Sequence, residues 1–257
     1  MKKQTIFLLL VILVFSLSCQ FLSPPAREGT IIFNCPDIVT AVRTIQPSDN
    51  PEILFETGIK QGDEFDANEY FNALTNISMQ SGYLLDYVYP IPDLGGSPIL
   101  YARPVEQPPY TSMEDIPEGT DLTDFRDRLE IEDVEQGYFE YVVMDIMAGQ
   151  FYLFWHANYN DTQIVCNSSE VNAIISDIND GSFGSTFDIS QEAKARAMQG
   201  IEPLVQLTEN TAIVEVIVFT KWGGFYRYTY TISRSFPHKI IDVKNENPVP
   251  YDCGVAF

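Results

Sequence analysis

Histidine and basic residues are scarce in this sequence. It has only two histidines, His156 and His238, so a metal site built from three or more histidines is excluded. Lysine and arginine together number 15, against 36 acidic residues, and the formal net charge is −21. Because proteins bind nucleic acid largely by neutralising phosphates with Lys and Arg, we expect no nucleic-acid partner. We interpret the excess negative charge as a contribution to solubility.

The sequence also lacks the short motifs that mark common active sites. It contains no GxGxxG, GxxxxGK[ST], HExxH or GxSxG pattern, which are the usual signs of a nucleotide site, a zinc protease or a serine hydrolase. The fragment "DINDG" at 177–181 is similar to a calcium loop, but its glycine comes one place early and the terminal glutamate is missing. We therefore interpret it as a helix end, and we expect neither a metal nor a cofactor.

The N-terminus, "MKKQTIFLLLVILVFSLSC", runs from two lysines through an apolar stretch to small residues before Cys19. This layout is typical of a signal peptide, and the apolar stretch is short for a membrane span, which needs about 20 residues. "SLSC" resembles the lipobox of bacterial lipoproteins, with Ser16 where such boxes usually carry leucine.

The lipobox resemblance implies a signal peptide over 1–18, a lipid such as palmitate on Cys19 and a tether over 19–30. The protein would then be anchored to the membrane on the extracytoplasmic face of the bacterial cell envelope. Removal of 1–18 takes away two lysines and changes the formal net charge from −21 to −23. A chain so acidic is repelled by anionic headgroups, so the lipid has to supply the membrane affinity.

If Cys19 carries lipid, three cysteines remain, and their wide spacing excludes a compact zinc motif such as paired CxxC. An extracytoplasmic location favours one disulfide bond among them. We expect it to join Cys166 and Cys253, which would fasten the C-terminal tail to the body of its own domain. The alternative for the odd cysteine is a catalytic thiol.

The two halves of the chain show a similar order of patterns. Each has a short apolar strand, a cysteine, an amphipathic segment and then Phe-Asp before a helical stretch, at "IIFNCPDIVTAV" (31–42) with "FDANEYFNAL" (65–74) and at "TQIVCNSSEVNAII" (162–175) with "FDISQEAKARAM" (187–198). This order predicts an α+β protein of two tandem related modules, 31–160 and 161–257, each with helices followed by a curved antiparallel β-sheet. Chance similarity between short segments is the alternative.

The first module carries an acidic insertion at 104–137. Between Glu114 and Glu135 there are ten carboxylates, against only Arg126 and Arg128. We expect this segment to be a solvated excursion on the surface, with a calcium or partner site as the alternative.

The second module contains three consecutive strand patterns. "TAIVEVIVFT" (211–220) and "FYRYTYTIS" (225–233) alternate around the turn "KWGG", and "KIIDV" (239–243) predicts a further antiparallel strand. Tyr226, Tyr228 and Tyr230 would share one sheet face. Together with the helical stretch before them, 187–245 resembles the α+β roll of nuclear transport factor 2-like and ketosteroid isomerase-like proteins. The resemblance implies a curved sheet with a pocket, but no catalytic pattern of that family can be matched residue by residue.

The segment 138–157 is interpreted as the matching hairpin of the first module. It reads as a strand, a turn at Gly149 and a second strand, with Trp155 and His156 on opposite faces of the second strand. Apolar residues on both of its faces predict a central, covered strand.

His156 has two interpretations. Beside Tyr159 and Asp161 it has the parts of a general base with an orienting carboxylate. We favour the structural interpretation, in which its imidazole satisfies a buried polar position through Asp161 or a backbone carbonyl. For His238, which follows a proline, we expect a place at the surface or at the start of a strand.

Three kinds of function remain. We expect a non-catalytic, lipid-anchored binding or interaction module that holds an unknown ligand or envelope protein, with Tyr226, Tyr228, Tyr230 and Trp155 as candidate contacts. One alternative is a small-molecule enzyme of the isomerase-like roll type that uses His156 or Asp242 as a base. The other is an envelope scaffold or assembly factor.

Overall fold

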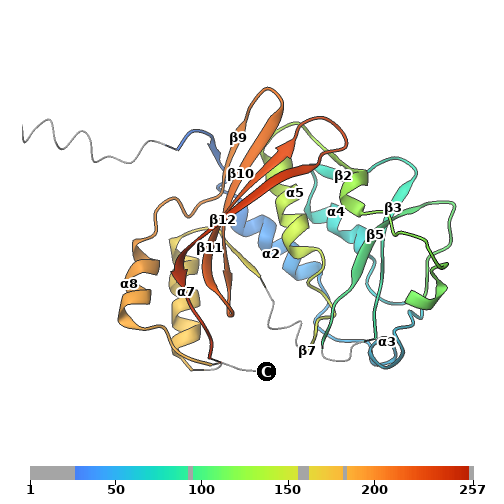
Figure 1. Cartoon of the computed structure of the whole chain (residues 1–257), viewed down its shortest axis with the longest axis horizontal. Helices are drawn as coiled ribbons and strands as arrows, with labels where there is room; N and C mark the ends of the chain where they lie inside the picture. Colours follow the sequence, from blue (N-terminus) through green and yellow to red (C-terminus); the bar gives the residue numbers. More distant parts are fainter. Residues whose placement is uncertain (1–26, 92–94, 156–161, 182–183, 255–257) are drawn as a thin grey trace, which may run out of the picture.

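The computed structural model describes residues 27–91, 95–155, 162–181 and 184–254. Helices and antiparallel strands are mixed, so the fold is α+β, as the sequence predicts (Figure 1). The elements of 27–155 are β1 (Thr30–Ile31), α2 (Cys35–Ile45), α3 (Glu52–Thr57), η2 (Ala67–Glu69), α4 (Tyr70–Ala73), β2 (Ile77–Met79), β3 (Tyr83–Val88), β4 (Gly95–Gly96), β5 (Ile99–Pro104), η3 (Met113–Asp115), η4 (Phe125–Arg128), β6 (Leu129–Ile131), α5 (Glu135–Met147) and β7 (Phe154–Trp155). Those of 162–254 are β8 (Gln163–Val165), α7 (Ser168–Asn179), α8 (Ile189–Ala197), β9 (Leu204–Leu207), β10 (Thr211–Thr220), β11 (Gly224–Ser233) and β12 (Ile240–Pro250).

The largest sheet is formed mainly by the C-terminal strands. Its order is β1, β9, β10, β11 and β12, and β8 pairs with β10 along the same edge as β9. All of these pairings are antiparallel. The predicted strands at 211–220, 225–233 and 239–243 are confirmed, and the third one extends to Pro250.

The hairpin of β10 and β11 has the predicted register. Valines 218, 216 and 214 lie opposite Tyr226, Tyr228 and Tyr230. Its turn requires glycine at 224, where φ is 90° and an added Cβ would lie 2.2 Å from the carbonyl oxygen of Val249.

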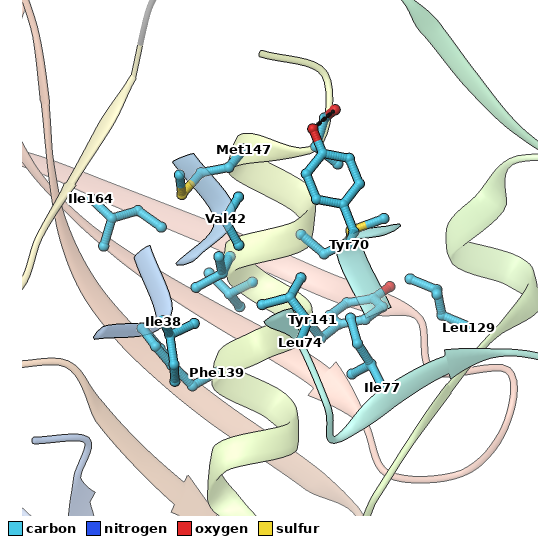
Figure 2. Packing of buried hydrophobic residues seen from close by; sticks show 14 of the residues in the cluster. Ile38, Val42, Tyr70, Leu74, Ile77, Leu129, Phe139, Tyr141, Met147 and Ile164 are labelled. Atoms are coloured by element: carbon cyan, nitrogen blue, oxygen red, sulfur yellow. Dashed lines mark hydrogen bonds between the residues drawn. The ribbon is translucent and has the colours of Figure 1, made fainter. Parts of the chain in front are cut away.

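Both faces of this sheet are covered. The face that carries Val214 and Val216 belongs to the larger hydrophobic core, with α2 and α5, and Figure 2 shows part of that core. The opposite face carries Ile217 and Phe219 and belongs to a second cluster with α7 and α8. Strand β10 is therefore buried on both sides, which explains its nearly continuous apolar sequence.

The larger core is shared between the two predicted modules. It contains Ile38 and Val42 of the first and Val214 and Val216 of the second. Strand β1 of the first also pairs with β9 of the second. Within the described residues, the first half otherwise forms only two-stranded sheets, whereas the largest sheet has six strands. The tandem-module organisation is not confirmed by this arrangement and stays a prediction.

The interpretation of 138–157 as a strand hairpin is wrong. Residues Glu135–Met147 form helix α5, which lies at the centre of the molecule (Figure 1). Tyr138, Phe139, Val142 and Val143 are all essentially inaccessible to water. A helix buried on all sides has no polar face, so its sequence shows no helical periodicity and resembles a covered strand.

Glycine at position 137 lets α5 begin close to the end of β6. An added Cβ there would lie 2.3 Å from the carbonyl oxygen of Glu132, a backbone atom that cannot turn aside. We expect Gly137→Ala to lower the free energy of unfolding by about 2 kcal/mol, as overpacking does, despite the higher helix propensity of alanine. Chemical denaturation measures this change. Gly149→Ala is the matched control, because its Cβ would meet nothing nearer than Leu100 at 3.7 Å; equal stability losses would contradict the steric explanation.

A buried carboxylate ties α5 to the strand region beside it. Glu140 is 1% exposed and accepts hydrogen bonds from the Asn76 amide (2.7 Å), the Asn76 side chain (2.7 Å) and Gln136 (2.8 Å). In Glu140→Gln, one oxygen becomes an NH2 group that faces another donor. We expect a loss of about 1.5 to 3 kcal/mol in unfolding free energy.

The control for Glu140 is Glu192→Gln. Glu192 also accepts a side-chain amide, from Asn179 at 2.8 Å, but its side chain is 32% exposed. Water replaces the lost acceptor there, so thermal or urea unfolding is expected to show a much smaller change. A Glu140→Gln variant as stable as wild type would contradict the importance of the buried carboxylate.

The predicted pairing of Cys166 with Cys253 is wrong. Cys166 is bonded to Cys35, with 5.6 Å between the Cα atoms, and Cys253 is a free, buried cysteine. Cys35 begins α2 and Cys166 follows β8, so the bond joins the two halves of the chain. Cys253 instead belongs to the second cluster, together with residues of the sheet and of α7.

Candidate functional site

One cavity in the described part of the chain has a volume of about 400 Å³. It lies where β3 and β5 meet the turn that leads from α3 to η2, on the side of the molecule away from α7 and α8 (Figure 1). The start of the acidic insertion closes it: the carbonyl of Thr111 accepts the amide of Lys60 at 2.8 Å. We call it the Lys60 cavity.

Three charged side chains meet at the floor of this cavity. Lys60 Nζ lies 2.7 Å from Asp86 Oδ1, and Arg103 Nε lies 2.6 Å from Asp86 Oδ2. The exposed fraction of each side chain is only 11 to 14%. Interactions between charges with so little exposure are weakly screened, so the three groups hold one another in place.

Strand pairing brings these residues together. In the register of β3 and β5, Leu84 lies opposite Arg103 and Asp86 lies opposite Tyr101, so Asp86 and Arg103 project from the same face. Lys60 reaches them from the turn after α3, and its ammonium group also donates to the carbonyl of Tyr87 at 2.6 Å. Arg103 additionally donates to the carbonyl of Gln107, in the acidic insertion.

Tyr87 lines the same cavity with an unsatisfied hydroxyl. Its side chain is 2% exposed, and its hydroxyl has no hydrogen-bond partner among the described residues. The Lys60 ammonium lies 4.6 Å from the centre of its ring. Burial raises the pKa of Tyr87 well above its ordinary value, so the phenol stays protonated at neutral pH. A buried phenol hydroxyl without a hydrogen-bond partner is destabilising unless another group, such as a water molecule, supplies one.

The rim of the cavity has carboxylates and aromatic rings. Glu64 accepts the amides of Gln61 (2.6 Å) and Gly62 (2.8 Å), which fixes the turn after Lys60. Asp66 Oδ1 accepts the amide of Asn68 at 2.9 Å and so caps η2. Phe65 and Tyr110 supply the apolar part of the lining.

The predicted tyrosine row on β11 is present. The ring centres of Tyr226 and Tyr228 are 6.0 Å apart, and those of Tyr228 and Tyr230 are 6.2 Å apart. Tyr230 is only 5% exposed and belongs to the core, while the other two are half-buried. These three residues do not line the Lys60 cavity.

Tyr230 lines a second cavity, of about 390 Å³, between α5, β12 and the acidic insertion. Arg126 lines it and is bound by Asp124 (2.6 Å) and Asp145 (2.9 Å). Burial, followed by the nearby Asp145 carboxylate, raises the pKa of Tyr230 above its ordinary value. Most residues of the acidic insertion are exposed, and the insertion also contributes lining residues to both cavities.

Several predicted site residues lie outside the described part of the chain. These are Cys19, His156, Tyr159 and Asp161. The backbone of Trp155 is described, and it pairs with Gly95 in the short sheet of β4 and β7.

Asp242 and His238 are described, and neither is placed as a catalytic group. Asp242 is exposed on β12, 3.9 Å from Lys244, and lines neither large cavity. Of the two places expected for His238, the surface is wrong, because the residue is 7% exposed, and the start of a strand fits, because β12 begins two residues later. Its ring packs edge-on against Tyr138, and its Nδ1 lies 3.2 Å from the carbonyl oxygen of Ser233.

Sequence reasoning missed Lys60, Asp86 and Arg103. A signal was present, because "YLLDYV" places one acidic residue within an otherwise apolar strand. A charge at a covered strand position needs a partner. The sequence alone did not indicate that two cations would share it.

No group of three or more His, Cys, Asp or Glu residues in the described ranges could hold a metal ion. The described helices also include none with the length and apolar character of a membrane span. Comparisons with protein-family models, with curated proteins and with solved structures found no match.

Proposed function

We propose that this chain is a lipid-anchored extracytoplasmic protein that binds a small polar ligand in the Lys60 cavity without transforming it. The observation that carries the proposal is the floor of this cavity, where three charged side chains are fixed with most of their surface removed from water. A cavity of this size with a few fixed polar groups is typical of ligand sites, since such groups set the orientation and specificity of a ligand.

Binding is favoured over catalysis because the charged groups of the floor already neutralise one another in part. Lys60 and Arg103 both donate to Asp86, so none of the three is free to act as a base or a nucleophile. The enzyme alternative with Asp242 as base is less favoured, because this exposed residue lines neither of the two cavities described above.

Two observations support the extracytoplasmic location. The N-terminal sequence has the layout of a signal peptide with a lipobox-like "SLSC", and the disulfide bond of Cys35 and Cys166 suits an oxidising compartment. Metabolic labelling with a palmitate analogue is expected to tag the wild type but not Cys19→Ala. A tag on the variant would contradict lipidation at Cys19.

The binding proposal is tested by obstructing the rim of the cavity. Gln61 is exposed there, and its side chain donates only to the carbonyl two residues earlier, Ile59. Gln61→Trp is therefore expected to fill space in the cavity without unfolding the protein. Gln199→Trp is the matched control, since exposed Gln199 makes the same kind of bond, to Ala197, and does not line the cavity.

The readout is equilibrium dialysis of the purified protein against a mixture of amino acids, sugars and organic acids, followed by mass spectrometry of what is retained. We expect the wild type and Gln199→Trp to retain the same compound and Gln61→Trp to lose it. No retained compound, or equal retention by both tryptophan variants, would contradict the proposal. The first of these results would favour the scaffold alternative.

A further inference from the structure

The floor of the Lys60 cavity carries more positive charge than its own carboxylate can neutralise. Both oxygens of Asp86 are occupied, Oδ1 by Lys60 Nζ and the Tyr87 amide and Oδ2 by Arg103 Nε. In the described part of the chain, Lys60 and Arg103 form no ion pair with any other carboxylate, and Arg103 Nη2 donates to no described atom. A charge so far removed from water is costly unless an anion accompanies it.

The rim of the cavity has the opposite sign. Glu64 and Asp66 lie there, and of the two oxygens of Asp66 only Oδ1 accepts hydrogen bonds from described residues. Asp66 Oδ2 is therefore available to a ligand donor. The cavity thus presents a cationic floor and an anionic rim, and Phe65 and Tyr110 add apolar surface to its lining.

We infer that the ligand of the Lys60 cavity is a small zwitterion of the amino-acid class, with its carboxylate bound by Lys60 and Arg103 and its ammonium group at Asp66. This inference rests on the proposed binding function. Arg103 supplies a planar donor for a carboxylate, and Lys60 supplies a point charge.

Charge and size exclude the main competitors. A polyanion such as a nucleotide would be repelled by Glu64 and Asp66 and by a chain whose net charge is −21. A volume of about 400 Å³ lies at the low end of ligand pockets, which range over about 300–1,000 Å³, and is too small to enclose an acyl lipid or an oligosaccharide. A neutral sugar would leave the excess positive charge unpaired.

Calorimetric titration of the purified protein with the standard free amino acids tests the inference. The best binder is then compared with its methyl ester, which has no carboxylate, and with its N-acetyl derivative, which has no ammonium group. We expect each derivative to bind at least about tenfold more weakly, because a charged hydrogen-bond partner is lost.

Two conservative variants test separately the site of the ligand's carboxylate and the site of its ammonium group. Lys60→Gln retains a donor for Asp86 but removes the excess charge, and it is expected to weaken binding of the free amino acid at least about tenfold. Asp66→Asn retains a side chain that can cap η2. It is expected to weaken binding of the free amino acid but to leave the N-acetyl derivative unaffected. Lys239→Gln, outside this cavity, is the control.

The outcomes separate this inference from the proposed function. Saturable binding of a neutral sugar with equal affinity in wild type and Lys60→Gln would overturn the zwitterion while the binding function stands. Binding of the ester as tight as that of the free amino acid would do the same. If no amino acid and no sugar binds, and Gln61→Trp is indistinguishable from wild type, both fail. Circular dichroism checks that each variant is folded.

Discussion

Replacing both Cys35 and Cys166 with serine is expected to lower the free energy of unfolding by about 2 to 5 kcal/mol, one of the two largest effects among the substitutions considered. The two cysteines are 131 positions apart, and the bond between them closes a loop that holds most of the first half of the chain. Opening so long a loop gives the unfolded state much more conformational freedom. Urea unfolding of the wild type, with and without reductant, measures the loss.

The double variant provides its own control. Reductant is expected to bring the wild type close to the double variant and to leave the double variant unchanged. Cys253→Ser is expected to keep the effect of reductant, because Cys253 is not part of the bond. Peptide mapping without reduction should find Cys35 joined to Cys166; a peptide that joins Cys166 to Cys253 would contradict the observed pairing.

The sequence predicted the second half of the fold well because its signals are local. Strands β10, β11 and β12 follow from alternation and from the glycine turn, and their register follows from the requirement that Tyr230 and the valines share a buried face. The position of Tyr230 in the core also follows from this pattern. What the pattern did not give is whether the tyrosines bind a ligand, because the same alternation serves burial and binding equally.

The predictions from the sequence were wrong for a helix that is almost fully buried and for a bond between residues far apart along the chain. Helix α5 is buried on nearly every side, so the periodicity that identifies a helix is absent from "YFEYVVMDIM". The partner of Cys166 could not be chosen from the sequence, because all three pairings of the remaining cysteines span long loops. The expected bond within one module gave way to one that joins the two halves.

For the Lys60 cavity, the sequence indicated one residue of the site but not its partners. The acidic residue in β3 was visible as an exception in an apolar strand, yet its partners come from a turn 26 positions before it and a strand 17 positions after it. Only the tertiary fold shows that two cations meet one carboxylate. It also gives the acidic insertion a role, since Gln107 and Thr111 hold Arg103 and Lys60 through their carbonyls.

Asp86→Asn is the second substitution expected to have a large effect, with a loss of about 3 to 5 kcal/mol in the free energy of unfolding. Asparagine has nearly the same shape, but it leaves Lys60 and Arg103 as two unneutralised cations with exposed fractions of only 11% and 14%. The loss comes from these uncompensated charges rather than from missing volume. The control is Asp242→Asn, on an exposed strand 3.9 Å from Lys244, where a loss of no more than about 1 kcal/mol is expected.

Added acetate distinguishes a charge effect from a packing effect in Asp86→Asn. If the cations of the floor lack an anion, acetate is expected to bind beside them and to raise the unfolding midpoint of this variant more than that of the wild type, in proportion to the logarithm of its concentration once the site is saturated. Asp242→Asn should respond as the wild type does. An Asp86→Asn variant that is as stable as Asp242→Asn, or that is destabilised but indifferent to acetate at constant ionic strength, would show that the floor does not carry an excess positive charge that needs an anion. The assignment of a carboxylate ligand to this cavity depends on that same charge, so a stability measurement on one substitution bears directly on the chemistry of the site.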